Sequence, residues 1–137
     1  MTIKAKLEWK EKMQFAGQAG SSPSVLLDNP DGKTGPTPME MLLMGVAGCT
    51  AMDVVAILKK MRVEIESLNV VVEGDLTDDY PKHFSRMHVI YEFTGKDLPV
   101  DKLQKAIDLS SEKYCGVSAV YRKAMEMTSE ILIKETI

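Results

Sequence analysis

The sequence predicts an α+β fold, and two observations carry this prediction. A long apolar stretch over about residues 38–61 has the length and the start signals of a helix. Segments in which apolar and polar residues alternate, as in half-buried strands, lie on both sides of it. The chain has 137 residues, which is room for one core, so we expect a single domain over residues 1–137.

Residues 2–28 predict an N-terminal set of antiparallel strands. The segment from Ile3 to Lys10 alternates with a period of two, as expected for a strand with one buried face. Two further apolar stretches, at residues 13–16 and 24–27, are separated by glycine, serine and proline, which is typical of a meander. Residues 29–38 contain three prolines and two glycines and predict a loop.

The helix over about residues 38–61 has a clear predicted start. Thr37 is placed to cap it, Pro38 suits the first helical position, and Glu40 stands where a capping-box carboxylate reaches back to the Thr37 amide. The helix is long and apolar enough for a membrane span, but it contains Asp53 and two glycines. We therefore expect the buried central helix of a soluble protein and no membrane association.

Burial of this helix on most sides requires more protein than one small chain supplies. We therefore expect a second copy of the chain to cover it. Four small residues would allow another helix to approach closely: Gly45, Ala47, Gly48 and Ala51.

The C-terminal half predicts two strands, a helix and a final strand. Strands are expected over about residues 66–93, where two segments alternate: Leu68, Val70 and Val72, then Met87, Val89, Tyr91 and Phe93. A helix is expected over about residues 99–115, ended by Gly116, and a strand over about residues 125–134. We expect antiparallel sheets that pack on the long helix.

Charge and cysteine content exclude several functional classes. The net charge of −3 argues against nucleic-acid binding as a main role. Residues 2–12 alternate where a secretory segment would be continuously apolar, and two cysteines cannot build a disulfide scaffold. The expected compartment is the cytoplasm.

Two cysteines are the candidate reactive residues. Cys49 falls within the long helix and Cys115 follows the second one, 66 positions later, so no local redox motif joins them. From spacing alone they are either a redox pair or small apolar core residues. Asp53, one helical turn after Cys49, either orients a polar ligand beside the thiol, or faces water or caps a break in the helix.

The two histidines do not predict a metal site. His83 and His88 are separated by an odd number of positions, so on one strand they would point to opposite faces. We expect no metal and no cofactor.

Both cysteines stand in sequence contexts that resemble the OsmC/Ohr family of thiol peroxidases. These contexts are TPMEMLLMGVAGC at residues 37–49 and KYCGVS at residues 113–118. The stretch over residues 38–60 looks most like the YhfA-like branch of that family, and the order of the predicted elements matches over nearly the full chain.

The resemblance implies an intertwined homodimer with the active sites at the interface. It implies that Cys49 attacks a peroxide and that Cys115 resolves the product as a disulfide, in a cycle closed by a dithiol reductant. It also implies an organic hydroperoxide as substrate.

The sequence departs from the family pattern around the nucleophile. The position of the family's activating Glu holds Met39, and Glu40 comes one residue later. The activating Arg of the N-terminal region is absent, because Arg62 is the first arginine in the chain. Three residues remain as candidate polar partners of Cys49: Glu40, Lys33 and Asp53. We expect the catalytic residues to be Cys49, Cys115 and Glu40.

Three functional hypotheses follow. The first is a cytoplasmic homodimer that reduces organic hydroperoxides through Cys49 and Cys115. The second is an inactive dimer of the same fold that binds a small apolar ligand, with cysteines that only pack. The third is a thiol enzyme that acts on a substrate other than a peroxide, such as a persulfide.

Overall fold

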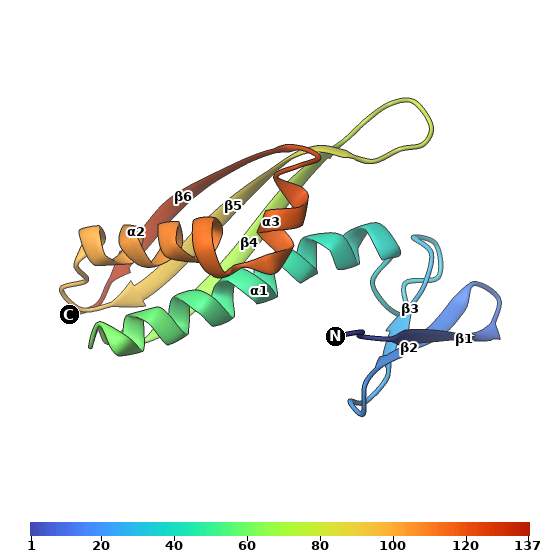
Figure 1. The fold of residues 1–137 in the computed structure, drawn as a ribbon, viewed down its shortest axis with the longest axis horizontal. Coiled ribbons are helices and arrows are strands. Elements are labelled where there is room, and N and C mark those ends of the chain that lie inside the picture. Colours follow the sequence, from blue (N-terminus) through green and yellow to red (C-terminus); the bar gives the residue numbers. More distant parts are fainter. The chain divides into compact units, whose positions relative to one another are not determined.

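The computed structural model describes all residues from 1 to 137. The chain forms two compact units, Met1–Leu42 and Leu43–Ile137. The elements are coloured along the chain in Figure 1.

The N-terminal unit contains a three-stranded antiparallel sheet in the order β1-β2-β3. Its strands are β1 (Ala5–Glu11), β2 (Gln14–Ala19) and β3 (Val25–Leu27). The alternation in β1 predicts one buried face, but within this chain the whole strand is exposed, and the side chain of Trp9 is 65% exposed. The apolar face of β1 therefore has no cover from its own chain.

Helix α1 (Pro38–Lys60) begins at the predicted capping box. The Thr37 backbone N–H donates to Glu40 Oε1 at 2.9 Å, and the Glu40 N–H donates to Thr37 Oγ1 at 3.1 Å. Two of the free donors at the helix start are thereby satisfied, which stabilises the first turn by about 1 kcal/mol.

Only one face of α1 is buried within the chain. Val46, Thr50, Val54 and Leu58 recur every four residues and are at most 1% exposed. On other faces Met44 and Met52 are 55% and 76% exposed, so burial on most sides is not achieved by one chain. By length and composition alone α1 is also the one helix that could cross a membrane.

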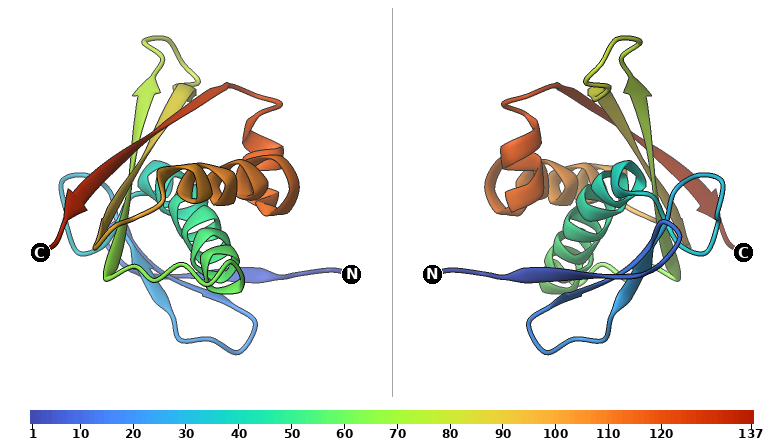
Figure 2. Two further views of the ribbon diagram at one scale, coloured as in Figure 1. Left: turned by 90° about the vertical axis from the view of Figure 1, so that its left-hand side faces the viewer. Right: turned by 90° about the vertical axis from the view of Figure 1, so that its right-hand side faces the viewer.

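The C-terminal unit is a three-stranded sheet with helices on one face. The strands are β4 (Ser67–Leu76), β5 (Phe84–Gly95) and β6 (Glu126–Glu135), in the order β4-β5-β6. In Figures 1 and 2, α1 and α2 (Val100–Leu109) run across the same face of this sheet. Between the helices and the sheet lies a core of buried side chains from three elements: Val54 and Leu58, then Val89, Tyr91 and Phe93, then Leu103, Ala106 and Ile107.

The expectation of antiparallel sheets is wrong for one strand pair. β4 and β5 are antiparallel, but β5 and β6 are parallel, with Met87 opposite Met127 and Tyr91 opposite Ile131. After β5 the chain runs back through α2 and α3 (Gly116–Tyr121), so that β6 begins beside the beginning of β5. This is the long crossover that a parallel pair requires.

The second helix also differs from the expected 99–115. Regular α-helix ends at Leu109, and residues Ser110–Tyr114 form a π-helical turn, η1. The turn closes with a hydrogen bond of 2.7 Å from the Cys115 N–H to the Ser110 carbonyl. Cys115 then takes an extended backbone conformation and begins α3. Such single turns widen a helix by one residue and occur often at functional sites.

Candidate functional site

The two cysteines come together although they are far apart in the sequence. Cys49 lies in the middle of α1 and Cys115 lies between η1 and α3, and both are free thiols. Their sulfur atoms and a carboxylate oxygen of Asp53 all lie within 4.8 Å of one another. A disulfide bond is about 2.05 Å long, so the two sulfurs are close but not bonded.

Cys115 is buried and its sulfur accepts two hydrogen bonds. Its side chain is 3% exposed. The backbone N–H of Ser118 donates to Cys115 Sγ at 3.3 Å, and the Ser118 hydroxyl donates to it at 3.1 Å. Cys115 is thus the N-cap residue of α3, with sulfur in the place of the usual oxygen acceptor.

Cys49 is half-buried, and its surroundings favour the neutral thiol. Burial raises the pKa of the Cys49 thiol, and Cys115 and the charge of Asp53 raise that pKa further. The Val117 backbone N–H opposes this rise in the Cys49 pKa by donating to the sulfur. No cationic side chain contributes to the Cys49 pKa, in agreement with the missing arginine of the N-terminal region.

A chain of buried hydroxyl groups leads to Asp53. The Ser110 hydroxyl donates to Asp53 Oδ2 at 3.0 Å and lies 2.8 Å from Thr50 Oγ1, which lies 2.7 Å from the Tyr91 hydroxyl. With Asp53 as the final acceptor, the Thr50 and Ser110 hydroxyls each donate once and accept once, and the Tyr91 hydroxyl donates to Thr50. The chain joins α1, η1 and β5, and it fixes the elements that carry the two thiols.

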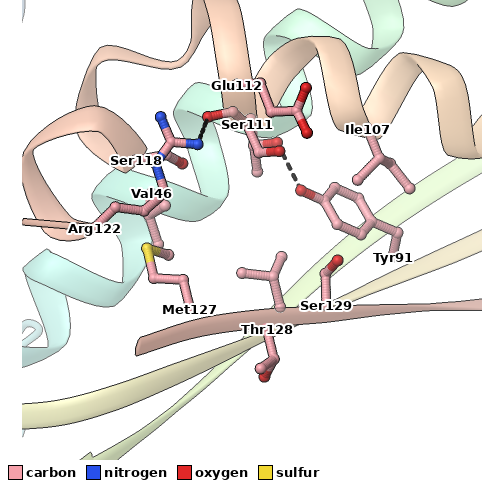
Figure 3. A pocket seen from close by; sticks show the side chains of 12 residues that line it. Val46, Tyr91, Ile107, Ser111, Glu112, Ser118, Arg122, Met127, Thr128 and Ser129 are labelled. Carbon is pink, nitrogen blue, oxygen red and sulfur yellow. Dashed lines mark hydrogen bonds between the residues drawn. The ribbon is translucent and has the colours of Figure 1, made fainter. Parts of the chain in front are cut away.

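A cavity of about 170 Å³ lies beside these hydrogen-bonded hydroxyl groups (Figure 3). Ser118, Thr50 and Tyr91 line it, so it is connected to Cys115 through a single hydroxyl. Arg122 also lines it, and its guanidinium donates to the Ser111 carbonyl. The remaining lining side chains are both apolar and polar: Val46, Val89, Ile107, Glu112, Met127, Thr128 and Ser129.

A second cavity, of about 440 Å³, lies beside Asp53. Its lining combines apolar side chains with Lys60, Lys105 and Tyr114. The apolar part consists of Ala56, Ile57, Met61 and Leu109. Organic molecules larger than water therefore have space beside Asp53.

The structure places two of the candidate polar partners in the N-terminal unit. Glu40 accepts the Thr37 N–H in the capping box, and Lys33 and Glu40 line the same hollow of that unit. Asp53 is the candidate polar partner that lies with both sulfurs.

Sequence reasoning missed the residues that hold the thiols in place. Ser110, Ser118 and Thr50 are hydroxyl residues without a recognisable motif, although Thr50 directly follows Cys49 and Ser118 stands three positions after Cys115. One signal was available for Ser118. An N-cap side chain accepts a hydrogen bond from the N–H three positions later, and Ser118 stands three positions after Cys115.

A long helix that carries one cysteine, packed against a sheet and beside a second cysteine, defines a thiol protein of the OsmC-like class. The family model described as "OsmC-like protein" matches residues 30–130, and the chain belongs to this family. The predicted resemblance is therefore confirmed.

Two relatives cover nearly the full chain. Protein YhfA of Escherichia coli strain K12 is 36% identical over 126 residues, which are 92% of this chain and 94% of that protein. A hypothetical protein from Aquifex aeolicus VF5 has a solved structure with a TM-score of 0.90 and 26% identity, covering 100% of this chain and 99% of the other.

The fold also extends to a more distant protein. The organic hydroperoxide resistance protein OhrB of Bacillus subtilis has a TM-score of 0.65 at 18% identity, with 98% of both chains covered. At this identity the comparison shows a shared fold.

Proposed function

We propose that this protein is a thiol-dependent peroxidase that reduces organic hydroperoxides through Cys49 and Cys115. The observation that carries the proposal is the separation of at most 4.8 Å between two free sulfurs. Proteins of the same fold named for organic hydroperoxide resistance support the choice of substrate.

Cys49 is the proposed nucleophile because it is the more exposed thiol. Its thiolate attacks one peroxide oxygen, the O–O bond breaks, and the leaving alkoxide takes a proton to become an alcohol. Cys49 is then a sulfenic acid. The Cys115 sulfur attacks the Cys49 sulfur, water leaves, and a disulfide forms. An external dithiol reduces the disulfide and is itself oxidised to a disulfide.

The functional form that we propose is a cytoplasmic homodimer. Apolar side chains that the chain leaves exposed support it, above all Met52 on α1 and Trp9 on β1. No atom lies within 4 Å of a Cβ built at Gly48, so another helix has room to approach α1 there. In such a dimer, Glu40 of one chain is the proposed acidic partner of a thiol in the other. We expect Met52→Lys to shift the molecular mass measured by light scattering from dimer to monomer.

The second candidate is a dimer that binds a small apolar ligand without turning it over. The specific observation in its favour is that burial raises the pKa of Cys49 with no cation to oppose it. The cavity beside Asp53 would be its binding site. A thiol enzyme that acts on a substrate other than a peroxide, such as a persulfide, is the third candidate.

Steady-state turnover of cumene hydroperoxide with dithiothreitol tests the first proposal against the second. We expect Cys49→Ser to abolish turnover. In Cys115→Ser the Cys49 sulfenic acid can react only with an external thiol, so we expect no disulfide within the chain after peroxide. Ser85→Ala, on an exposed part of β5, is the control and should leave turnover unchanged. Equal turnover in the wild type and Cys49→Ser would remove the peroxidase proposal.

A further inference from the structure

Three potential metal ligands meet in the C-terminal unit, two of them partly buried and one buried. Cys49 and Asp53 lie one turn apart on α1, and Cys115 approaches from the start of α3. Their two sulfurs and one carboxylate oxygen lie within 4.8 Å of one another. In a tetrahedral site with Zn–S bonds of about 2.3 Å, two sulfurs are separated by about 3.8 Å. A shift of about 1 Å or less would bring the two sulfurs to that distance.

Each of the three side chains also accepts a hydrogen bond from outside the cluster. The Val117 N–H donates to Cys49 Sγ, the Ser118 N–H and hydroxyl donate to Cys115 Sγ, and the Ser110 hydroxyl donates to Asp53 Oδ2. Such outer donors orient the ligands of a metal site and stabilise their anionic forms. A divalent cation would stabilise the deprotonated forms of the two thiols beside the Asp53 carboxylate, so metal binding would release protons.

We propose that Cys49, Asp53 and Cys115 form a binding site for a thiophilic divalent metal ion such as Zn²⁺. Two thiolates and one carboxylate supply three ligands, and the fourth position is left to water or another small molecule. The sequence predicts no metal because the histidines cannot share one, and the proposal departs from that expectation by using thiols and a carboxylate.

The metal site does not depend on peroxidase activity. If the proposed peroxidase reaction also holds, the ion and the peroxide compete for the same two sulfurs, and the metal-bound form is the protected one. Binding is therefore measured without peroxide, and turnover is measured with a chelator present, so the two proposals can fail separately.

Cadmium titration of the reduced full-length protein is the direct test, because cadmium–thiolate bonds absorb in the ultraviolet. The protein is kept reduced with a phosphine, which competes weakly for the metal. We expect one Cd²⁺ per chain, with a charge-transfer band that is lost in Cys49→Ser and in Cys115→Ser. Zn²⁺ affinity follows from competition with a chromophoric chelator.

Asp53→Asn separates a three-ligand site from simple binding to two thiols. We expect this variant to bind Zn²⁺ at least about tenfold more weakly. Ser110→Ala keeps all three ligands and removes the hydrogen bonds of Ser110 to Asp53 and Thr50, so we expect it to lose about tenfold or less. Asp78→Asn, in an exposed turn, and His83→Ala, an exposed imidazole, are controls that should leave the affinity unchanged.

Two results would overturn the proposal. One is the absence of a cadmium–thiolate band in wild-type protein that circular dichroism shows to be folded. The other is a Zn²⁺ affinity that is the same in Asp53→Asn and the wild type. If a cysteine variant fails to fold, Asp53→Asn with its matched control still decides the question.

Discussion

The two thiols of this chain are the same functional group in opposite surroundings. Cys49 is half-buried on the long helix, and burial, Cys115 and Asp53 raise its pKa. Cys115 is 3% exposed and its sulfur accepts two hydrogen bonds from Ser118. Exposure and hydrogen bonding therefore divide the proposed roles: one thiol is accessible to a substrate, and the other is held in place beside it.

The largest expected difference is in the rate of alkylation of the two thiols. Because Cys115 is almost fully buried, its labelling by iodoacetamide requires local opening of the structure. We expect Cys49 to react on the order of a hundredfold faster, measured by peptide mass spectrometry at short times. Equal alkylation rates for the two cysteines would contradict the difference in their burial.

The second largest expected effect is on stability, from a break in the row of hydroxyl groups that joins α1, η1 and β5. Thr50→Val removes the hydrogen bonds to Tyr91 and Ser110 and leaves the Tyr91 hydroxyl unpaired in the core. We expect the free energy of unfolding to fall by about 1–2 kcal/mol in urea titrations, a five- to thirtyfold change in the unfolding constant.

Tyr91→Phe is the matched comparison for Thr50→Val. It removes one hydroxyl and leaves the hydrogen bond between Thr50 and Ser110 intact, so the free energy of unfolding should fall by less than in Thr50→Val. An equal or larger loss of unfolding free energy in Tyr91→Phe would contradict the proposed direction of hydrogen-bond donation from Tyr91 to Thr50 to Ser110.

The pH dependence of Cys49 alkylation should be steep. Its thiol pKa is raised, so at neutral pH the reactive thiolate is the minor form and its amount grows about tenfold for each unit of pH. We expect the rate to keep rising beyond the ordinary thiol pKa of about 8.5. A rate that reaches a plateau below pH 8 would show that the surroundings activate Cys49 instead.

The smallest expected effect comes from the charge of Asp53. Asp53→Asn removes one of the causes that raise the Cys49 pKa, and the least of them, so alkylation at pH 7 should become about threefold faster. Asp78→Asn serves as the control. A slower reaction in Asp53→Asn would indicate that the carboxylate accepts the thiol proton.

The sequence predicted well what depends on local pattern. The capping box of Thr37 and Glu40 forms as expected, and the alternating residues of β5, such as Met87 and Phe93, are buried on one face. The meeting of Cys49 and Cys115 came from the resemblance to a family, because two distant cysteines carry no spacing signal.

Other features could not be predicted for physical reasons. An alternating pattern is the same for parallel and antiparallel pairing, so the direction of β6 relative to β5 was not available. The π-helical turn at Ser110–Tyr114 has no residue type of its own, so its sequence looks like that of an ordinary helix. The bond from Ser110 to Asp53 depends on that turn and was missed with it.

The identity of the product after one equivalent of peroxide tests the joint action of the thiols most directly. Reduced protein would be treated with cumene hydroperoxide, and its intact mass and non-reduced peptides would be measured. We predict the loss of two hydrogens from each chain and a peptide pair joined by a bond between Cys49 and Cys115. Oxidation of Cys49 to sulfinic or sulfonic acid, with Cys115 still a free thiol, would contradict the account.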